Sequence, residues 1–154
     1  METIIKQITQ HQVEDIAYNW HYTNQYSFYD LDADEEDLNE FLDPIRRGDS
    51  TYAVSQNDDL IGFFTVQSVD GNSCDIGLGM RPDLTGRGAG QEFLKSVLSY
   101  VIVNFVPERI SLAVATFNAR AIKVYLKSGF IVADTYTQDT NGSSYEFIKM
   151  VYKC

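Results

Sequence analysis

Three glycines stand within five residues of this chain, in the segment Gly86-Arg87-Gly88-Ala89-Gly90, between an alternating strand pattern and a helical pattern. Glycines let the chain turn sharply from strand to helix, with backbone N–H groups pointing into a concavity that no Cβ blocks. The helix N-terminus adds free N–H donors, so such a turn can hold a phosphate or pyrophosphate. Arg87 and the earlier Arg81 could add charge. A tight strand-to-helix turn without a ligand is the simpler interpretation.

The spacing of these glycines excludes two common phosphate-binding motifs. Gln91 stands where the dinucleotide-binding pattern requires its third glycine, and the P-loop sequence Gly-Lys-Ser/Thr is absent. The loop therefore predicts an anion site of another kind.

The elements around the loop predict one α+β domain that spans residues 1–154. Alternating apolar residues and turn signals predict strands at Glu2–Ile8, Thr51–Gln56, Leu60–Val69, Ser73–Met80, Arg109–Ala115, Phe130–Thr137 and Tyr145–Tyr152. Helical spacing predicts a first helix after Thr9, a second after Asp34 that Pro44 shortens, a third after Gly90 and a fourth over Asn118–Ser128. The expected turn between the last two strands is Asp139–Gly142. The sheet is expected to be mainly antiparallel, with helical crossovers.

Charge and composition exclude several classes of function. Twelve Lys and Arg against 22 Asp and Glu give a formal net charge of −10, which repels nucleic acid and anionic membranes and attracts cationic partners. No apolar run approaches the roughly 20 residues that cross a bilayer, and the start lacks a basic signal-peptide region. Cys74 and Cys154 are expected as reduced thiols in the cytoplasm, and two histidines offer little material for a metal site or a Ser-His triad.

A second segment, Asn118 to Phe130, follows the strand after Pro107. Asn118 stands at a helix N-terminus, where its side chain can cap the helix or bind a ligand. Tyr125 lies two helical turns further on and can face the same cleft. Taken singly, a cap for Asn118 and core packing for Tyr125 are the simpler interpretations.

Together the two segments resemble the GNAT N-acetyltransferase superfamily. Pro82 to Gly90 is similar to its motif A, and Asn118-x-x-Ala121-x-x-x-Tyr125-x-x-x-Gly129-Phe130 is similar to its motif B. Their order and spacing match, and the flanking strands extend the resemblance over essentially the whole chain. The resemblance implies a GNAT-like three-layer fold of about seven strands and about four helices, with a splayed pair of parallel strands.

The resemblance also implies which residues hold acetyl-CoA as a co-substrate. The amides of the glycine loop would hold the pyrophosphate, the strand end before it would pair with the pantetheine arm, and motif B would reach pantetheine and sulfur. The residues so implied are Leu78, Gly79, Met80, Thr85, Gly86, Arg87, Gly88, Ala89, Gly90, Asn118 and Tyr125. The family usually has Gln or Arg where this chain has Thr85, which supplies a hydroxyl and no charge.

Direct acetyl transfer through a tetrahedral intermediate requires a neutral amine, a stabilised oxyanion and a proton for the leaving thiolate. Backbone donors at the splayed strand could polarise the thioester carbonyl. The hydroxyl of Tyr125 is the predicted general acid, because its ordinary pKa near 10 is close enough to that of a thiol. Asp75, the carboxylate in the strand that enters motif A, is the predicted base. A solvated Asp beside the turn at Asn72 is the alternative.

The acceptor site of this family is built by the first two helices, their loop and the last hairpin. Here that region supplies Trp20, Tyr22, Tyr26, Phe28 and Tyr29, followed by eight acidic residues and no basic residue within Asp30–Asp43. Aromatic rings beside carboxylates favour a cationic amine. A solvated acidic helix start beside core aromatics explains the same residues.

The leading hypothesis is a cytoplasmic acetyl-CoA-dependent N-acetyltransferase that acts on a primary amine of a small molecule or a peptide, without a metal and without nucleic acid or membrane partners. A catalytically weak acyl-CoA-binding sensor or regulatory module is the alternative, and a structural domain without a cofactor is a third. An exposed strand edge could pair two chains into a homodimer, although no residue pattern in the sequence requires it.

Overall fold

The computed structural model describes residues 3–85 and 88–154. Its elements run in the order β1 (Thr3–Gln7), α1 (Gln10–Asn19), α2 (Glu35–Leu42), α3 (Pro44–Arg47), β2 (Thr51–Gln56), β3 (Asp59–Val69), β4 (Ser73–Met80), α4 (Gly90–Phe105), β5 (Arg109–Ala115), α5 (Ala119–Lys127), β6 (Ile131–Thr140) and β7 (Ser143–Lys153). Short 3₁₀ helices cover Asn24–Tyr29 (η1), Leu31–Ala33 (η2) and Pro82–Leu84 (η3). The described residues thus give the α+β architecture that the sequence predicts.

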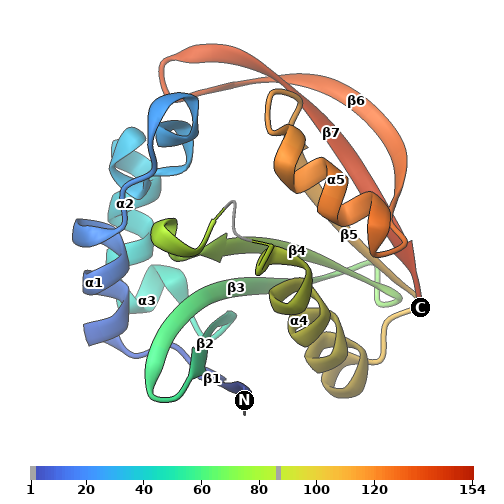
Figure 1. The fold of residues 1–154 in the computed structure, drawn as a ribbon, viewed down its shortest axis with the longest axis horizontal. Coiled ribbons are helices and arrows are strands. Elements are labelled where there is room, and N and C mark those ends of the chain that lie inside the picture. The colour runs from blue at the N-terminus through green and yellow to red at the C-terminus, as the bar shows by residue number, and fades with distance from the viewer. Residues whose placement is uncertain (1–2, 86–87) are drawn as a thin grey trace.

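The seven strands of the described residues join one sheet in the order β1-β2-β3-β4-β5-β7-β6. Neighbouring strands are antiparallel except β4 and β5, which run parallel and pair only from Ser73–Asp75 to Arg109–Ser111. Beyond these residues the two strands separate, as the splayed pair was expected to do. Figure 1 shows α1, α2 and α3 gathered on one side of β4, and α5 with β5, β6 and β7 on the other.

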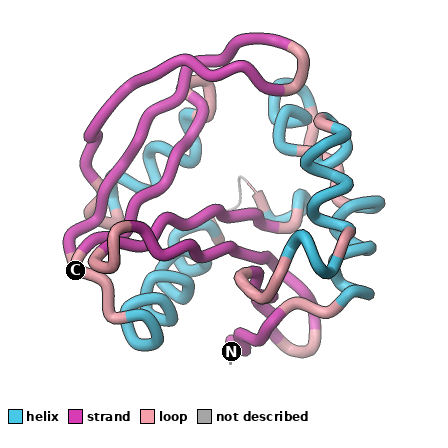
Figure 2. The backbone as a smooth tube through the Cα atoms, turned by 180° about the vertical axis from the view of Figure 1, so that it is seen from behind, coloured by secondary structure: helices cyan, strands magenta, loops and turns pink. Residues whose placement is uncertain are grey.

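Alternation along β3 explains why helices cover both faces of the sheet. Phe64 is fully buried in the core cluster, where its ring centroid lies 5.8 Å from that of Tyr100 on α4. The next side chain along, Phe63, meets Trp20 at 6.0 Å and Phe41 of α2 at 5.6 Å on the opposite face. The sheet therefore forms the middle of three layers, and the tube in Figure 2 shows the helices on either side of it.

Local sequence signals account for the ends of the first helices. Thr9 and Gln12 form a reciprocal capping box at α1, as their spacing predicts. Asp34 caps the start of α2. Asp43 is the C-cap of α2 and the N-cap of the short α3, whose first residue is Pro44. The single shortened helix that the sequence predicts is therefore two helices in the structure. Arg47 then ties α3 to α1 through a 3.0 Å bond to Gln10.

The last hairpin is longer than the sequence suggested. The connection is only Asn141 and Gly142, with φ of 51° and 78°. Two consecutive positive φ angles make a turn that matches the twist of the flanking strands, so β6 runs to Thr140 and β7 starts at Ser143. The predicted turn Asp139–Gly142 was therefore too wide.

Candidate active site

A cavity of about 560 Å³ opens where β4 and β5 separate. The end of β4, the start of α4 and one face of α5 line it, and α1, η1 and η2 close it on the other side. The same residues of β4 that were predicted to hold pantetheine, namely Leu78, Gly79 and Met80, are among its lining residues.

The backbone of β4 turns polar groups toward this cavity. The N–H of Arg81 donates to Ile61 of β3 at 2.8 Å, and peptide groups alternate in direction along a strand. Leu78 and Met80 therefore present their N–H and C=O groups to the side on which β5 has left the sheet. The carbonyl of Met80 accepts a 2.7 Å hydrogen bond from the hydroxyl of Tyr22 there. Leu78 lies beyond the residues of β4 that pair with β5.

The described part of the glycine loop leads to a helix start that lacks a side-chain cap. Gly88 has a φ of +79° and lines the cavity, as do Thr85 and Gly90. Ala89 is the N-cap of α4 and offers no side-chain acceptor, so the first N–H groups of this helix have no capping partner among the described residues. Gly86 and Arg87, both predicted to bind the cofactor, lie outside the described residues.

Two polar side chains near the loop are already engaged. The hydroxyl of Thr85 donates to the carbonyl of Pro82 at 2.7 Å. The guanidinium of Arg81 binds Asp83 at 2.7 Å and the carbonyl of Leu60 at 3.2 Å. Backbone groups rather than these side chains are therefore the free donors at this end of the cavity.

Helix α5 contributes positive charge that the sequence reasoning missed. Arg120, Lys123 and Lys127 line the cavity together with Asn118 and Tyr125. Their spacing of three and four residues, which places side chains on one helix face, was the signal that could have found them. Asn118 does cap the helix, since its Oδ1 accepts from the N–H of Ala121 at 3.2 Å, and it lines the cavity as well.

Tyr125 also combines its two predicted roles. Its ring packs against the core, 5.7 Å from that of Phe130, and the residue lines the cavity. Burial, with a smaller contribution from Tyr29, raises the pKa of the Tyr125 hydroxyl above its ordinary value. The hydroxyl therefore keeps its proton at neutral pH, and its pKa lies further from that of a thiol than the ordinary value on which the predicted acid role was based.

Asp75 is not brought to the cavity. Its neighbours Cys74 and Ile76 are buried, whereas Asp75 points to the opposite face of β4 and is exposed. There its carboxylate accepts a 3.0 Å hydrogen bond from the hydroxyl of Ser111 on β5. This position gives no support to the predicted role as a base. The described residues that line the cavity include no Asp, Glu or His.

Four of the five aromatic residues of the predicted acceptor region line the cavity, and the fifth does not. Trp20, Tyr22, Tyr26 and Tyr29 line the cavity. Phe28 instead belongs to an aromatic cluster that joins η1 to the β5–α5 connection and to β7, with ring centroids at 5.4 Å from Phe117, 4.6 Å from Tyr145 and 6.0 Å from Phe147. This cluster holds η1 in place over the cavity.

The acidic residues after Asp30 lie away from this cavity. Asp34 and Asp43 serve as helix caps, and Asp34, Glu35 and Glu36 line a separate cavity of about 490 Å³ beside Arg46 and the turn Asn141–Gly142. Burial, followed by the charge of Asp34, raises the pKa of Asp37. A capped acidic helix start, the simpler interpretation, therefore explains much of the run.

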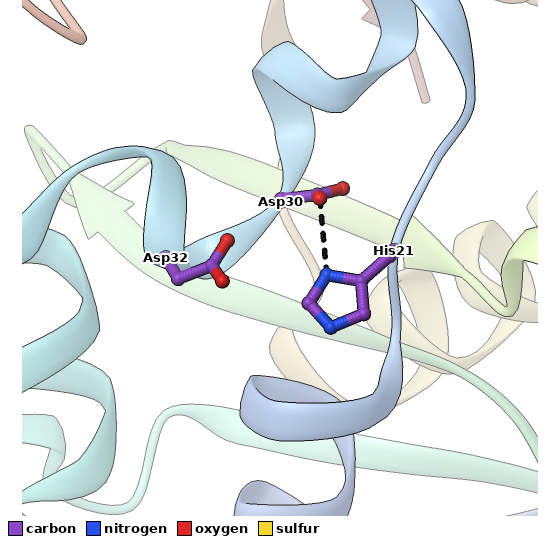
Figure 3. A group of neighbouring side chains, drawn as sticks. All are labelled: His21, Asp30 and Asp32. Atoms are coloured by element: carbon purple, nitrogen blue, oxygen red, sulfur yellow. Dashed lines mark hydrogen bonds and ion pairs between the residues drawn. The ribbon is translucent and has the colours of Figure 1, made fainter.

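His21, Asp30 and Asp32 bring three potential metal-ligating groups together at the surface (Figure 3). Both ring nitrogens of His21 are engaged by acceptors: Nδ1 lies 3.1 Å from Asp30, and Nε2 lies 3.0 Å from the carbonyl of Tyr18. Donation from both nitrogens requires the protonated ring, so a metal ion at His21 would have to displace one of these two hydrogen bonds. This arrangement is a hydrogen-bonded clasp, and Asp30 also accepts from the N–H of Tyr22 at 2.7 Å.

The family model for the acetyltransferase (GNAT) domain matches residues 3–131. The chain belongs to the GNAT acetyltransferase family. The resemblance seen in the two motifs is thus confirmed, and the predicted enzyme class, an N-acetyltransferase, agrees with this GNAT assignment.

Known proteins with a similar sequence or a similar structure agree with this assignment. Acetyltransferase PseH of Campylobacter jejuni is 26% identical over 83 residues, which are 54% of this chain and 52% of PseH, so the match spans about half the length of that curated relative. A chimera of the spermidine N-acetyltransferase SpeG of Vibrio cholerae with hSSAT has a TM-score of 0.74 at 17% identity and covers 99% of this chain and 96% of its own. A GNAT acetyltransferase of Bacillus anthracis has a TM-score of 0.72 at 14% identity, with 99% and 95% covered.

These neighbours confirm the predicted GNAT fold, with its seven-stranded mixed sheet and parallel β4–β5 pair. Among the helices in the described residues, none is long and apolar enough to span a membrane.

Proposed function

We propose that this GNAT domain transfers the acetyl group of acetyl-CoA to a primary amine of a small molecule or a peptide. The observation that carries the proposal is the cavity at the separated ends of β4 and β5. It joins unpaired strand backbone, an uncapped helix N-terminus, three basic side chains and a protonated tyrosine in one space.

The lining residues fit a molecule with a polyphosphate end and an amide-containing arm. The N-terminus of α4 with Gly88, and Lys123 and Lys127 of α5, are suited to phosphate. The backbone of Leu78 on the open edge of β4 can form strand-like hydrogen bonds with the amides of an extended arm. Acetyl-CoA supplies the acetyl group as a thioester, whose carbonyl carbon accepts the amine.

Tyr125 would act as the proton donor. As the amine nitrogen forms its bond to the acetyl carbon and the carbon–sulfur bond breaks, the electron pair stays on sulfur and takes the hydroxyl proton of Tyr125. Solvent then returns a proton to Tyr125. The proton that the amine nitrogen loses passes to water, because the described lining residues offer no carboxylate or imidazole to receive it. The structural neighbours include the spermidine N-acetyltransferase SpeG, and this likeness supports an amine as acceptor.

The first test is thermal unfolding with acetyl-CoA, CoA and ATP, on the wild type, Gly88→Val and Gly71→Val. A ligand of the folded state at 100 times its Kd adds about 2.7 kcal/mol, a clear shift in melting temperature. Valine is strained at both glycines, whose φ angles are +79° and +82° and whose Cβ would meet no atom within 4 Å. Only Gly88 lines the cavity, so Gly71→Val controls for backbone strain.

We expect acetyl-CoA and CoA to stabilise the wild type and Gly71→Val, and Gly88→Val to lose this stabilisation. Absence of a shift at millimolar CoA in the wild type would refute both the transferase and the acyl-CoA sensor. Equal rises in melting temperature with CoA in the two valine variants would show that the phosphate site does not include Gly88.

A further inference from the structure

The side of the cavity opposite α4 and α5 is an aromatic wall formed by Trp20, Tyr22, Tyr26, Tyr29, Leu31 and Phe63. The groups suited to phosphate come from α4 and α5, and Tyr125 also lies on α5. An amine that reaches the thioester must therefore approach along this wall. The inference below rests on the proposed function and concerns the acceptor.

Two hydroxyl groups of the wall, those of Tyr22 and Tyr29, are occupied within the protein. The hydroxyl of Tyr22 donates to Met80 at 2.7 Å, and the oxygen of Tyr29 accepts from the N–H of Ala115 at 3.3 Å. Burial is the main cause that raises the pKa of each of these two hydroxyls, so both are neutral at physiological pH. At these two residues the wall thus presents ring faces to a ligand, and Leu31 and Phe63 add apolar carbon.

The charges around the cavity have one sign. Within the described residues, the charged side chains that line it are Arg120, Lys123 and Lys127, all positive. The guanidinium of Arg120 already lies over the ring of Tyr26, 4.0 Å from its centroid, and so fills the cation–π position there.

The carboxylate beside the wall is also engaged. Asp30 is only 12% exposed, and it binds His21 at 3.1 Å and the N–H of Tyr22 at 2.7 Å. The acidic side chains of Asp34, Glu35 and Glu36 line the other cavity. A second ammonium group on the acceptor would therefore lose its hydration beside apolar rings and the like charge of Arg120, without a carboxylate partner.

We propose that the acceptor is a monoamine carried on an aromatic or other apolar group, and that the wall discriminates against diamines and polyamines. The ring or chain next to the amine gains apolar contact on Tyr22 and Phe63, and removing this surface from water favours its binding. An acidic net charge of −10 thus coexists with an acceptor site that does not select polycations.

The test compares amines that differ only in a second ammonium group. One pair is benzylamine with a para methyl group against its analogue with a para aminomethyl group, and the other is pentylamine against cadaverine. Thiol release from acetyl-CoA measures kcat/KM, and spermidine is included in the panel. We expect each monoamine to exceed its diamine by roughly tenfold or more, a ratio that corresponds to about 1.4 kcal/mol.

Three variants test whether the charge at the wall causes this preference. Leu31→Glu places a carboxylate in the wall and should favour the diamines, whereas Leu31→Gln, a matched neutral change, should not. Arg120→Gln removes the cation next to Tyr26 and should lower the ratio of kcat/KM for a monoamine to that for its diamine. This variant tests the cause independently of whether the Leu31 variants fold.

The outcomes separate the inference from the proposed function. Diamines or spermidine turned over as well as the monoamines would overturn the inference and leave the acetyltransferase intact. Binding of acetyl-CoA without acetylation of either monoamine would also overturn it. Failure to bind acetyl-CoA would instead refute the proposed function.

Discussion

The hydroxyl of Tyr22 donates a 2.7 Å hydrogen bond to the carbonyl of Met80, and so joins the loop after α1 to the end of β4. The two residues are 58 positions apart in the sequence. Their bond uses a strand carbonyl that β5 would have paired had the parallel strands stayed together. It closes one end of the cavity and fixes the aromatic wall relative to the strand edge predicted to hold the pantetheine arm.

Replacing Tyr22 with Phe removes this hydroxyl and leaves the Met80 carbonyl without its partner. We expect a loss of about 1 kcal/mol in the free energy of unfolding, because a part-buried hydrogen bond is then lost. In a domain of this size each kcal/mol lowers the melting temperature by about 2 to 4 °C. Tyr18→Phe is the control, since Tyr18 is 59% exposed, and it should change stability by less than about 0.5 kcal/mol. Equal effects in the two variants would contradict this account.

Tyr125→Phe separates an enzyme from a sensor. The ring that packs against Phe130 is retained, and only the protonated hydroxyl is lost. We expect kcat to fall by roughly 100-fold to 10,000-fold, the usual contribution of a general acid, while stabilisation by acetyl-CoA in thermal unfolding persists. Unchanged turnover would remove Tyr125 from the chemistry. A loss of acetyl-CoA binding with no separate effect on kcat would make its role structural.

The basic face of α5 should contribute to acetyl-CoA affinity. We expect the double change Lys123→Gln with Lys127→Gln to raise the Kd for acetyl-CoA by roughly tenfold at low salt, which is about 1.4 kcal/mol. The effect should shrink at high salt, because exposed charges are screened. Isothermal titration at two ionic strengths measures both quantities. Lys95→Gln on α4 is the control, because Lys95 is not among the residues that line the cavity. An equal loss of acetyl-CoA affinity in this control would show that the effect comes from the net charge and not from the basic face of α5.

Local signals predicted the strands and most of the helices of this fold, but not the division between α2 and α3. The capping box at Thr9 and the cap at Asp34 act within a few residues and were predicted, whereas the cap that Asp43 provides for α3 was not. The turn at Asn141 was placed too widely, because alternation along the strands weakens where both faces are exposed.

The site was less accessible to sequence reasoning, since it depends on which face of an element each side chain occupies. Asp75 was chosen for its position in the chain, yet alternation along β4 turns it toward Ser111 and away from the cavity. The cations of α5 could not be assigned to the site from sequence alone, because basic residues are also common on the solvated face of a helix. The bond from Tyr22 to Met80 follows from the tertiary fold and has no local signature.

The clasp at His21 predicts a pH-dependent contribution to stability. The pKa of His21 is raised, first by its hydrogen bond to Asp30 and next by that to the carbonyl of Tyr18. A raised folded-state pKa means that the stabilisation is complete below the ordinary value near 6.5 and is lost as pH rises through the folded-state pKa. We expect His21→Ala to destabilise the protein more at pH 5.5 than at pH 9, in urea unfolding followed at both values.

The control for this clasp is His11→Ala, which removes the other histidine of the chain. His21 is 49% exposed, so the pH-dependent difference should be small and should weaken with added salt. Asp30→Asn should abolish most of the pH dependence, because it removes the carboxylate that favours the imidazolium. It should also lower stability at both pH values, since Asp30 holds the N–H of Tyr22 as well. If His21→Ala cost the same at both pH values, the ring would be held by packing and not by its charge.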